Sequence, residues 1–203
     1  MKVMIFRMLS LSNKETIIQI TLTIVTLIGA LLIMRNNWKR YSALFLLSAL
    51  VSLVLCYIFV KIGLYTFPMR LFPKLTSIPI STVVTVFSFY VLLGVRFSPA
   101  LWIWKIPVYW VMVHVGMLAE SWAVQETNLI QYAKFWDVWD SYTWWWIYLL
   151  VFEWVGGMIV PAESRRPINH TWLQYGKLGW FLLHFILIVT IFLGGFYLGR
   201  VSK

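Results

Sequence analysis

The chain has 203 residues, of which 61% are hydrophobic and only 12% are charged. Soluble domains carry about 25% charged residues because their surfaces face water, so this composition excludes a water-soluble protein and indicates a surface that faces lipid. The formal net charge is +10. The basic residues are spread over every loop and form no single patch, so we expect them to contact membrane lipid headgroups and expect no nucleic-acid partner.

Six apolar runs come close to the roughly 20 residues that a helix needs to cross the hydrocarbon core. They lie near 16–34, 41–60, 75–95, 106–124, 143–160 and 178–199. The alternating segments of a membrane β-barrel are absent, so only helices can satisfy the backbone inside lipid. We therefore expect an all-α integral membrane protein, a single membrane domain over 1–203 that forms a bundle of about six transmembrane helices.

The orientation of this bundle depends on where lysine and arginine lie, because short cytoplasmic loops retain positive charge. The counts for the two sides are nearly equal. Density distinguishes them: Arg35, Lys39 and Arg40 fall within six residues, and Arg165 and Arg166 are adjacent. We therefore expect both termini on the outside of the membrane.

The sequence predicts neither a metal nor a cofactor. Its single cysteine, Cys56, lies within the second span, so a disulfide within the chain and a CxxC pair are both impossible, and we expect a buried, inert thiol. The three histidines come from separate segments without metal-ligand spacing.

The acidic residues are concentrated in one segment. Of seven in the chain, five lie between positions 120 and 153, namely Glu120, Glu126, Asp137, Asp140 and Glu153. The fourth span's end, the following loop and the fifth span, which contain these five acids, also hold seven tryptophans: Trp122, Trp136, Trp139, Trp144, Trp145, Trp146 and Trp154. These tryptophans can form an interfacial aromatic belt. Alternatively, carboxylates beside aromatic faces can form a site for an organic cation.

Three polar residues lie deep within the last three predicted spans: His114, Glu153 and His184. An ionised carboxylate at mid-membrane costs at least about 2.5 kcal/mol unless it is paired or solvated, so Glu153 should face inward. If the histidines also face inward, the three form a possible proton relay or weak metal site. The alternative for each histidine is a hydrogen bond between helices.

A second polar group is expected where the loops 61–74 and 120–142 form a mouth of the bundle. Its members are Arg70, Lys74, Glu120, Glu126, Asp137 and Asp140. Repeated Phe-Pro pairs make residues 67–74 a stiff, non-helical connector that holds Arg70 in place. Glu120 lies close to the membrane boundary, where Arg70 or Lys74 is its expected partner. The cluster can therefore be a ligand site or a structural network of ion pairs.

Two motifs resemble those of an uncharacterised family of small multi-pass membrane proteins of Gram-positive, spore-forming bacteria. One is the Phe-Pro-Met-Arg-Leu-Phe-Pro-Lys loop at 67–74, and the other is Glu120 seven residues before the Thr-Asn-Leu-Ile-Gln-Tyr string at 127–132. The resemblance covers about 16–160 and implies a helical fold in a bacterial plasma membrane, without a known activity. A second family glutamate is replaced here by Val124, with Glu126 nearby, and the sixth span lies outside the resemblance.

Three functions remain open at this point. The first is a non-enzymatic protein that binds or transports a small ligand at the mouth. The second is a subunit of an envelope complex or a homo-oligomer, in which the polar groups only fix the helices. The third, which we rank lower, is an enzyme acting on a lipid or lipid-linked substrate, with Glu120, Glu153 or His114 as the acid or base.

Overall fold

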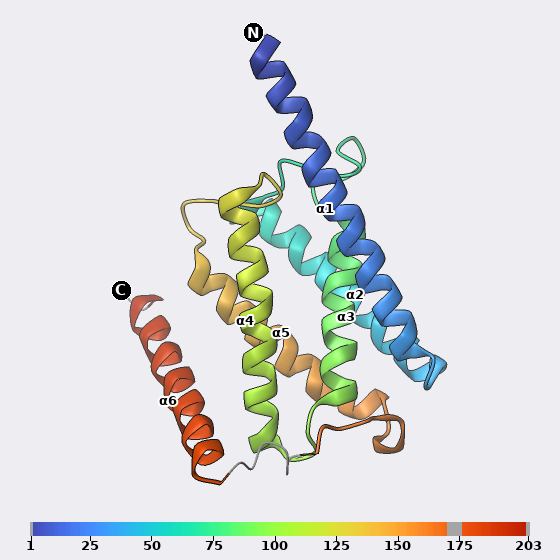
Figure 1. The fold of residues 1–203 in the computed structure, drawn as a ribbon, viewed down its shortest axis with the longest axis vertical. Coiled ribbons are helices and arrows are strands. Elements are labelled where there is room, and N and C mark those ends of the chain that lie inside the picture. The colour runs from blue at the N-terminus through green and yellow to red at the C-terminus, as the bar shows by residue number, and fades with distance from the viewer. Residues whose placement is uncertain (1, 170–175, 202–203) are drawn as a thin grey trace.

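The fold is a bundle of six long helices, seen in a computed structural model that describes residues 2–169 and 176–201 (Figure 1). The long helices are α1 (Lys2–Met34), α2 (Trp38–Lys61), α3 (Ile80–Phe97), α4 (Trp102–Glu126), α5 (Val138–Ile159) and α6 (Gly176–Val201). Two short strands, β1 (Tyr65–Thr66) and β2 (Gln131–Tyr132), and one 3-10 turn, η1 (Ala162–Ser164), lie between them. The prediction of an all-helical bundle is confirmed.

Five of these helices are long and apolar enough to cross a membrane: Lys14–Met34, Trp38–Lys61, Ile80–Phe97, Trp102–Glu126 and Gly179–Tyr197. The remaining predicted span, 143–160, corresponds to α5, a helix of 22 residues that does not reach the same hydropathy. Tryptophan, tyrosine and aspartate, which hydropathy scales count as polar, occupy much of its first half.

The helix at the predicted span near 75–95 begins later than that range. Helix α3 begins at Ile80 with Pro79 as its N-cap. Residues 75–79 belong to the preceding loop, where the Thr76 hydroxyl donates to the Ile78 carbonyl at 2.6 Å. A proline is compatible with the cap because its missing N–H has no partner inside the helix.

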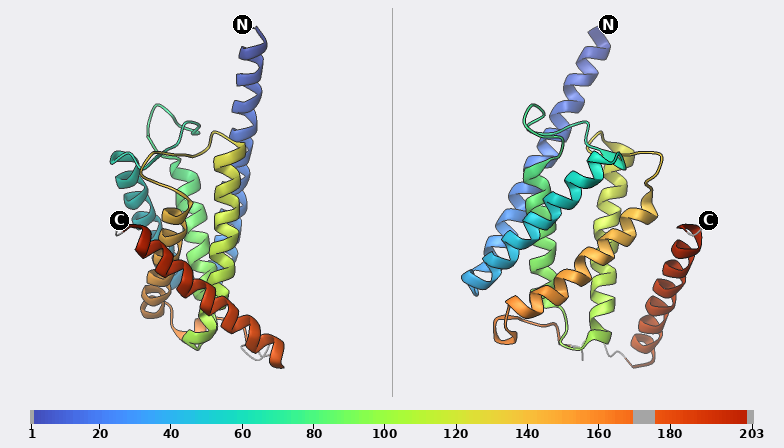
Figure 2. Two further views of the ribbon diagram at one scale, coloured as in Figure 1. Left: turned by 90° about the vertical axis from the view of Figure 1, so that its left-hand side faces the viewer. Right: turned by 180° about the vertical axis from the view of Figure 1, so that it is seen from behind.

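Helix α3 lies at the centre of the bundle and packs against α1, α2, α4 and α5 (Figures 1 and 2). Two hydrogen bonds fix the position of α2 against its neighbours. The Ser88 hydroxyl of α3 donates to the Phe45 carbonyl at 3.2 Å, and the hydroxyls of Ser48 on α2 and Tyr148 on α5 lie 2.7 Å apart. The outer faces carry large apolar side chains, among them Leu46, which is 67% exposed, and Ile191, which is 73% exposed. This is the pattern expected where lipid is the solvent.

The two ends of the bundle differ. One end carries the two-stranded β-ribbon of β1 and β2, and we call it the ribbon end. The opposite end carries the segment 160–168, which connects α5 to the following residues, and we call it the connector end. Helix α5 begins at the ribbon end, where Trp136 packs on Tyr65, and it reaches the connector end, where Glu153 bonds Lys105. Helix α6 then runs back toward the ribbon end, where Arg200 pairs with Asp137. The N-terminal end of α1 and the C-terminal end of α6 therefore lie on the same side of the bundle (Figure 1).

Candidate functional site

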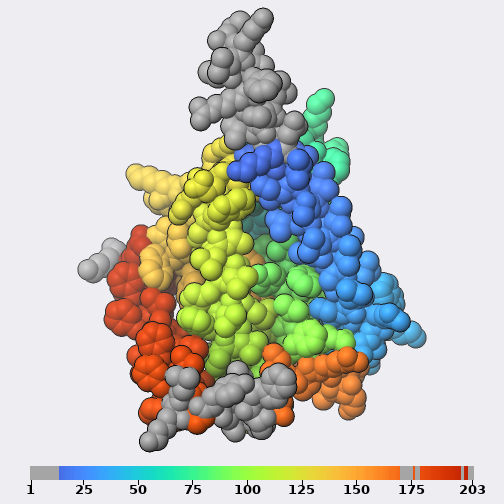
Figure 3. All heavy atoms as spheres, in the orientation of Figure 1, coloured from blue at the N-terminus to red at the C-terminus, as the bar shows by residue number. Residues whose placement is uncertain are grey.

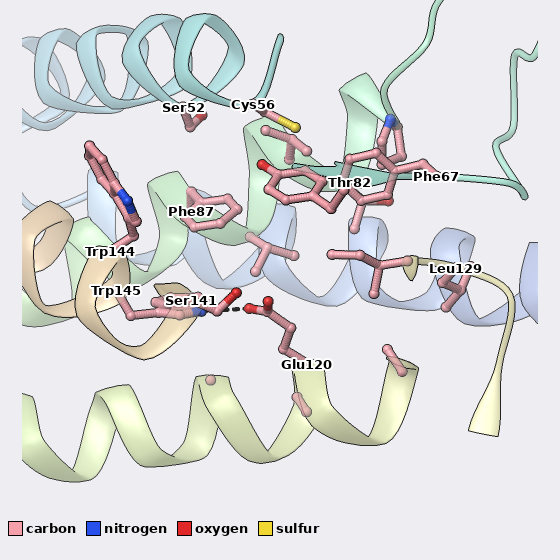
Figure 4. A pocket seen from close by; sticks show the side chains of 18 of the residues that line it. Ser52, Cys56, Phe67, Thr82, Phe87, Glu120, Leu129, Ser141, Trp144 and Trp145 are labelled. Carbon is pink, nitrogen blue, oxygen red and sulfur yellow. Dashed lines mark hydrogen bonds between the residues drawn. The ribbon is translucent and has the colours of Figure 1, made fainter. Parts of the chain in front are cut away.

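A cavity of about 310 Å³ lies in the ribbon half of the bundle, and all of the helices from α1 to α5 contribute to its wall. The lining is largely apolar and aromatic, as Figure 4 shows for many of its members. Aromatic rings come from Phe59, Tyr65, Phe67, Phe87, Tyr90, Trp136, Trp144, Trp145 and Tyr148. Polar atoms come mainly from Gln19, Thr26, Ser52, Cys56, Thr82, Glu120 and Ser141.

The aromatic wall is held by mutual packing. The Phe87 and Trp145 rings stack with centroids 4.9 Å apart, and Phe59 contacts Trp144 at 4.8 Å and Trp136 at 5.1 Å. Such offset and edge-on pairs are favourable beyond their buried area, by about 0.5–1.5 kcal/mol each. The cavity is therefore bounded by rings that support one another.

The two sequence motifs meet at the ribbon end and close the cavity there. Strand β1 pairs antiparallel with β2, with Tyr65 opposite Tyr132. The Met69 amide also donates to the Asn128 carbonyl at 3.2 Å. As predicted, residues 67–74 are non-helical. The motif loops therefore form one lid, which places Phe67 and Leu129 over the cavity.

Helix α1 holds this lid through two buried polar side chains that sequence reasoning missed. Glu15, which is 1% exposed, accepts from the Asn128 amide at 2.6 Å. One turn later, Gln19 donates to the Met69 carbonyl at 2.9 Å. Glu15 lies directly before the predicted span 16–34, so in the sequence it marks only the start of a membrane span. Nothing in the sequence indicates its contact with a loop more than 100 residues away.

Glu120 projects from α4 into the wall of the cavity (Figure 4). Its Oε2 atom accepts from the Trp145 indole N–H at 2.7 Å, and Oε1 accepts from the Tyr132 hydroxyl at 2.6 Å. Both of these donors are neutral. The expected ion pair with Arg70 or Lys74 is therefore wrong: within the described residues, neither comes within 4 Å of this carboxylate.

A glycine one helical turn before Glu120 makes the contact with Trp145 possible. A Cβ atom on Gly116 would lie 3.2 Å from the Trp145 ring, a tight contact that would push the indole slightly away from α4. Because residues four apart share a helix face, the same indole reaches the Glu120 carboxylate. The pattern Gly116-x-x-x-Glu120 thus positions the acid.

Tyr132 remains a hydrogen-bond donor to Glu120 over the physiological pH range. Burial, and then the neighbouring Glu120 charge, raises the pKa of the Tyr132 phenol well above its usual value. The phenol therefore stays protonated at neutral pH. The same burial raises the pKa of Tyr65 on the paired strand.

The other members of the predicted mouth cluster do not converge on Glu120. Arg70 donates to the Phe67 carbonyl within its own loop. Lys74 and Glu126 are exposed. The hypothesis of a multi-residue charged site at the mouth is wrong, because the loop folds over the cavity and directs its basic side chains elsewhere.

Asp137 and Asp140 have a structural role at the start of α5. Asp137 is the N-cap, accepting from the Trp139 amide at 2.8 Å, and Asp140 accepts from the Asp137 amide at 2.8 Å, which completes a capping box. The same residues hold α6: Arg200 pairs with Asp137, and Tyr197 donates to Asp140 at 3.0 Å.

Glu153 is buried, as predicted, but it lies at the connector end and not beside the histidines. It pairs with Lys105, accepts from the Tyr109 hydroxyl at 2.6 Å, and lies 3.3 Å from the Arg165 guanidinium. Ser98 adds a contact at 3.1 Å. This carboxylate is 2% exposed, and two cations balance its charge.

The two histidines bind their own helices. His114 Nδ1 lies 2.7 Å from the Trp110 carbonyl, and His184 Nδ1 lies 2.7 Å from the Trp180 carbonyl. The predicted group of Glu153, His114 and His184 at one depth in the membrane is therefore wrong. The alternative, a hydrogen bond between helices, is not made by these two Nδ1 atoms either. Among the described residues, no group of three or more His, Cys, Asp or Glu side chains is placed to hold a metal ion.

Some tryptophans fit an interfacial aromatic belt, and others fit a binding site. Trp122 and Trp154 are 46% and 62% exposed, as an interfacial belt requires, whereas Trp136 and Trp145 are each 7% exposed and line the cavity. Cys56 is free and buried, as expected, and it also borders the cavity. Periodicity did not distinguish the lining tryptophans from the outer ones, because all occur in one dense segment.

Comparison of the chain with protein-family models, with curated proteins and with solved structures found no match. The resemblance to a bacterial membrane family therefore stays a prediction, and the function has to be inferred from the cavity and its residues.

Proposed function

We propose that this protein binds a small, largely apolar ligand in the cavity beneath the β1–β2 lid. The observation that carries the proposal is a space of about 310 Å³ walled by aromatic rings, with one carboxylate on the wall. Small-molecule sites are mostly apolar hollows of about 300–1,000 Å³ with a few placed polar groups.

A purely structural role explains this space less well. Protein interiors are close-packed, so a hollow of about 310 Å³ within the bundle forgoes contacts that a purely structural scaffold would make. A bound molecule supplies these contacts.

The enzymatic alternative has less support from the geometry. Its candidate residues lie apart: Glu120 borders the cavity, Glu153 is enclosed by charged partners at the connector end, and His114 bonds its own helix. General acid–base chemistry needs a group free to exchange a proton with the substrate. Of the three, only Glu120 adjoins a space that could hold one.

We further infer that the protein lies in a bacterial plasma membrane with six crossings. Helix α5 starts beside β1 and reaches the start of α4 at the other end of the bundle, so it traverses the bundle like its neighbours (Figure 2). Its lower hydropathy is explained by side chains that face protein: Trp145, Tyr148 and Glu153 are all buried. Membrane lipids are then the surrounding partners of the outer faces.

The proposal can be tested by filling the cavity. Ala119 lines it, and Ala119→Trp would occupy part of its volume, whereas Ala43→Trp on the exposed face of α2 is the matched control. The binding probe is the apolar dye N-phenyl-1-naphthylamine, added to protein in phosphatidylcholine nanodiscs, with protein-free discs subtracted. We expect saturable fluorescence with wild type and Ala43→Trp, and at least a tenfold weaker affinity with Ala119→Trp.

The absence of saturable binding to wild type would contradict the proposal. So would an unchanged affinity in a folded Ala119→Trp variant. If that variant does not fold, Ala123→Leu, from the next turn of the lining, makes the same comparison with a smaller side chain.

A further inference from the structure

We infer that the ligand is an amphipathic organic cation that reaches the cavity from the bilayer between α1 and α4 and places its charged nitrogen against Glu120. This inference rests on the proposed binding function. It specifies the charge of the ligand, its orientation in the cavity and the route by which it enters.

The charge of the ligand follows from the partners of Glu120. Its carboxylate accepts hydrogen bonds from Tyr132 and Trp145, and neither donor is charged. Within the described part of the chain, the residues that line the cavity include no lysine, arginine or histidine. A carboxylate in apolar surroundings is stabilised by an opposite charge, and here a ligand is the group in a position to supply it.

The aromatic wall favours the same chemistry. Trp144 and Trp145 come from α5 and border the space into which Glu120 projects (Figure 4). Ring faces attract organic cations, tryptophan most strongly, and they also accept the apolar groups attached to the nitrogen. An anion or a zwitterion with its carboxylate at Glu120 would meet repulsion at the same position.

The orientation of the ligand follows from the depth of Glu120. The residue lies six positions before the end of α4, about 9 Å along the helix axis from the ribbon end. Farther from that end, the lining consists of rings such as Phe87 and Tyr148. The cavity thus has its charge toward one membrane surface and its apolar part deeper, like an amphipathic molecule in a leaflet.

The route follows from what covers the cavity. The lid closes the ribbon end, and Glu15 and Gln19 bind it to α1. On the flank, Figure 3 shows a hollow in the surface between α1 and α4. Leu22 of α1 and Ala119 of α4 are exposed and also line the cavity, so they form the rim of a lateral opening.

The test compares two probes of the same shape. One is 4-phenylbutyltrimethylammonium, and the other is its neutral carbon isostere, with tert-butyl in place of trimethylammonium. Each displaces the dye N-phenyl-1-naphthylamine from protein in phosphatidylcholine nanodiscs. We expect the ammonium compound to bind wild type at least tenfold more tightly than the isostere. Glu120→Gln should abolish this preference, whereas Glu126→Gln, an exposed control on the same helix, should keep it.

Equal affinity of wild type for the two probes would overturn the inference and leave the proposed function standing. Tighter binding of 4-phenylbutanesulfonate than of the ammonium compound would overturn it as well. Failure of the dye itself to bind is the separate result that contradicts the proposed function. Tetramethylammonium, which has the charge without the apolar part, should bind at least a hundredfold more weakly, and equal binding would contradict an amphipathic ligand.

The lateral route has its own measurement. Leu22→Trp narrows the rim and should slow association of the dye at least fivefold, while Leu46→Trp on the outer face of α2 should leave the rate unchanged. An unchanged rate in a folded Leu22→Trp variant would contradict access between α1 and α4.

Discussion

Glu120 and Glu153 are two carboxylates within one bundle, and their surroundings differ in every respect that bears on function. Glu153 is bonded by Lys105, Tyr109 and Ser98 and approached by Arg165 at the connector end, where it is buried. Glu120 has two neutral donors and a cavity beside it. An acid with its charge balanced inside the protein acts as a structural element, whereas an acid with an unbalanced charge beside a space is placed to bind.

Each carboxylate depends on a glycine that admits an aromatic ring. A Cβ atom on Gly94 would lie 2.6 Å from the Tyr109 hydroxyl oxygen, just as one on Gly116 would press on Trp145. In both places a missing side chain lets a ring lie against a neighbouring helix and donate to an acid. The local construction is therefore shared, and the presence or absence of cations makes the difference.

The largest effect is expected from removing the balanced acid. Glu153→Ala leaves Lys105 and Arg165 buried without their counter-charge, so the free energy of unfolding should fall by about 3–5 kcal/mol. Unfolding in mixed micelles with rising sodium dodecyl sulfate measures the change. Glu126→Ala, which removes an exposed acid, is the control and should change stability by less than about 0.5 kcal/mol.

The pairing itself is measured by combining Lys105→Met with Glu153→Gln. Each single change removes one partner of the Lys105–Glu153 pair, and the double change removes both, while Arg165 is present in all four proteins. The double variant should therefore be more stable than the sum of the singles by about 2 kcal/mol. Strict additivity would show that the two residues do not stabilise the bundle through each other.

The unbalanced acid should show the reverse behaviour. Glu120→Gln removes the charge and puts an amide NH2 in place of one of the two acceptor oxygens. The remaining oxygen can accept from the Trp145 indole, and the Tyr132 hydroxyl can rotate to accept from the NH2, so we expect less than about 1.5 kcal/mol of lost stability. The same variant should lose tenfold or more of its affinity for 4-phenylbutyltrimethylammonium. A loss of stability as large as that of Glu153→Ala would assign Glu120 a structural role and remove the contrast.

The smallest effects are expected at the start of α5, where acids act through caps and exposed pairs. Asp137→Ala removes an N-cap and should cost about 0.5–2 kcal/mol. Arg200→Ala removes only its half-exposed ion pair with Asp137 and should cost below about 1 kcal/mol. Neither should alter binding of the dye. Weaker binding of the dye to either variant would show that the site reaches the C-terminal end of α6.

Hydropathy was sufficient to locate the helices but not the partners of their polar residues. Apolar runs predicted a helix at each of the six positions, because the cost of burying polar backbone and side chains in lipid is local in sequence. Lys105 lies one residue before the predicted span 106–124, yet the first turn of α4 carries it inward to Glu153. Pairings of this kind depend on helix rotation and tilt.

The segment that the sequence singled out borders the cavity, although its residues interact differently from the prediction. The concentration of acids and tryptophans pointed to 120–153, and the two loop motifs do meet there. The chemistry differed, because Arg70 and Lys74 do not reach Glu120 and Asp137 and Asp140 cap α5. The cavity could not be predicted, since a space is defined by the joint packing of five helices and not by a residue pattern.

Labelling with dicyclohexylcarbodiimide, an apolar reagent that modifies carboxyl groups reached from the membrane, tests the difference between the two acids most directly. Peptide mass spectrometry of the intact protein after labelling in nanodiscs reads both positions in one sample. We predict that Glu120 is modified, that 4-phenylbutyltrimethylammonium protects it at least tenfold better than the neutral isostere, and that the enclosed Glu153 is unmodified. Modification of Glu153 at the rate of Glu120, or no selective protection of Glu120, would contradict the account.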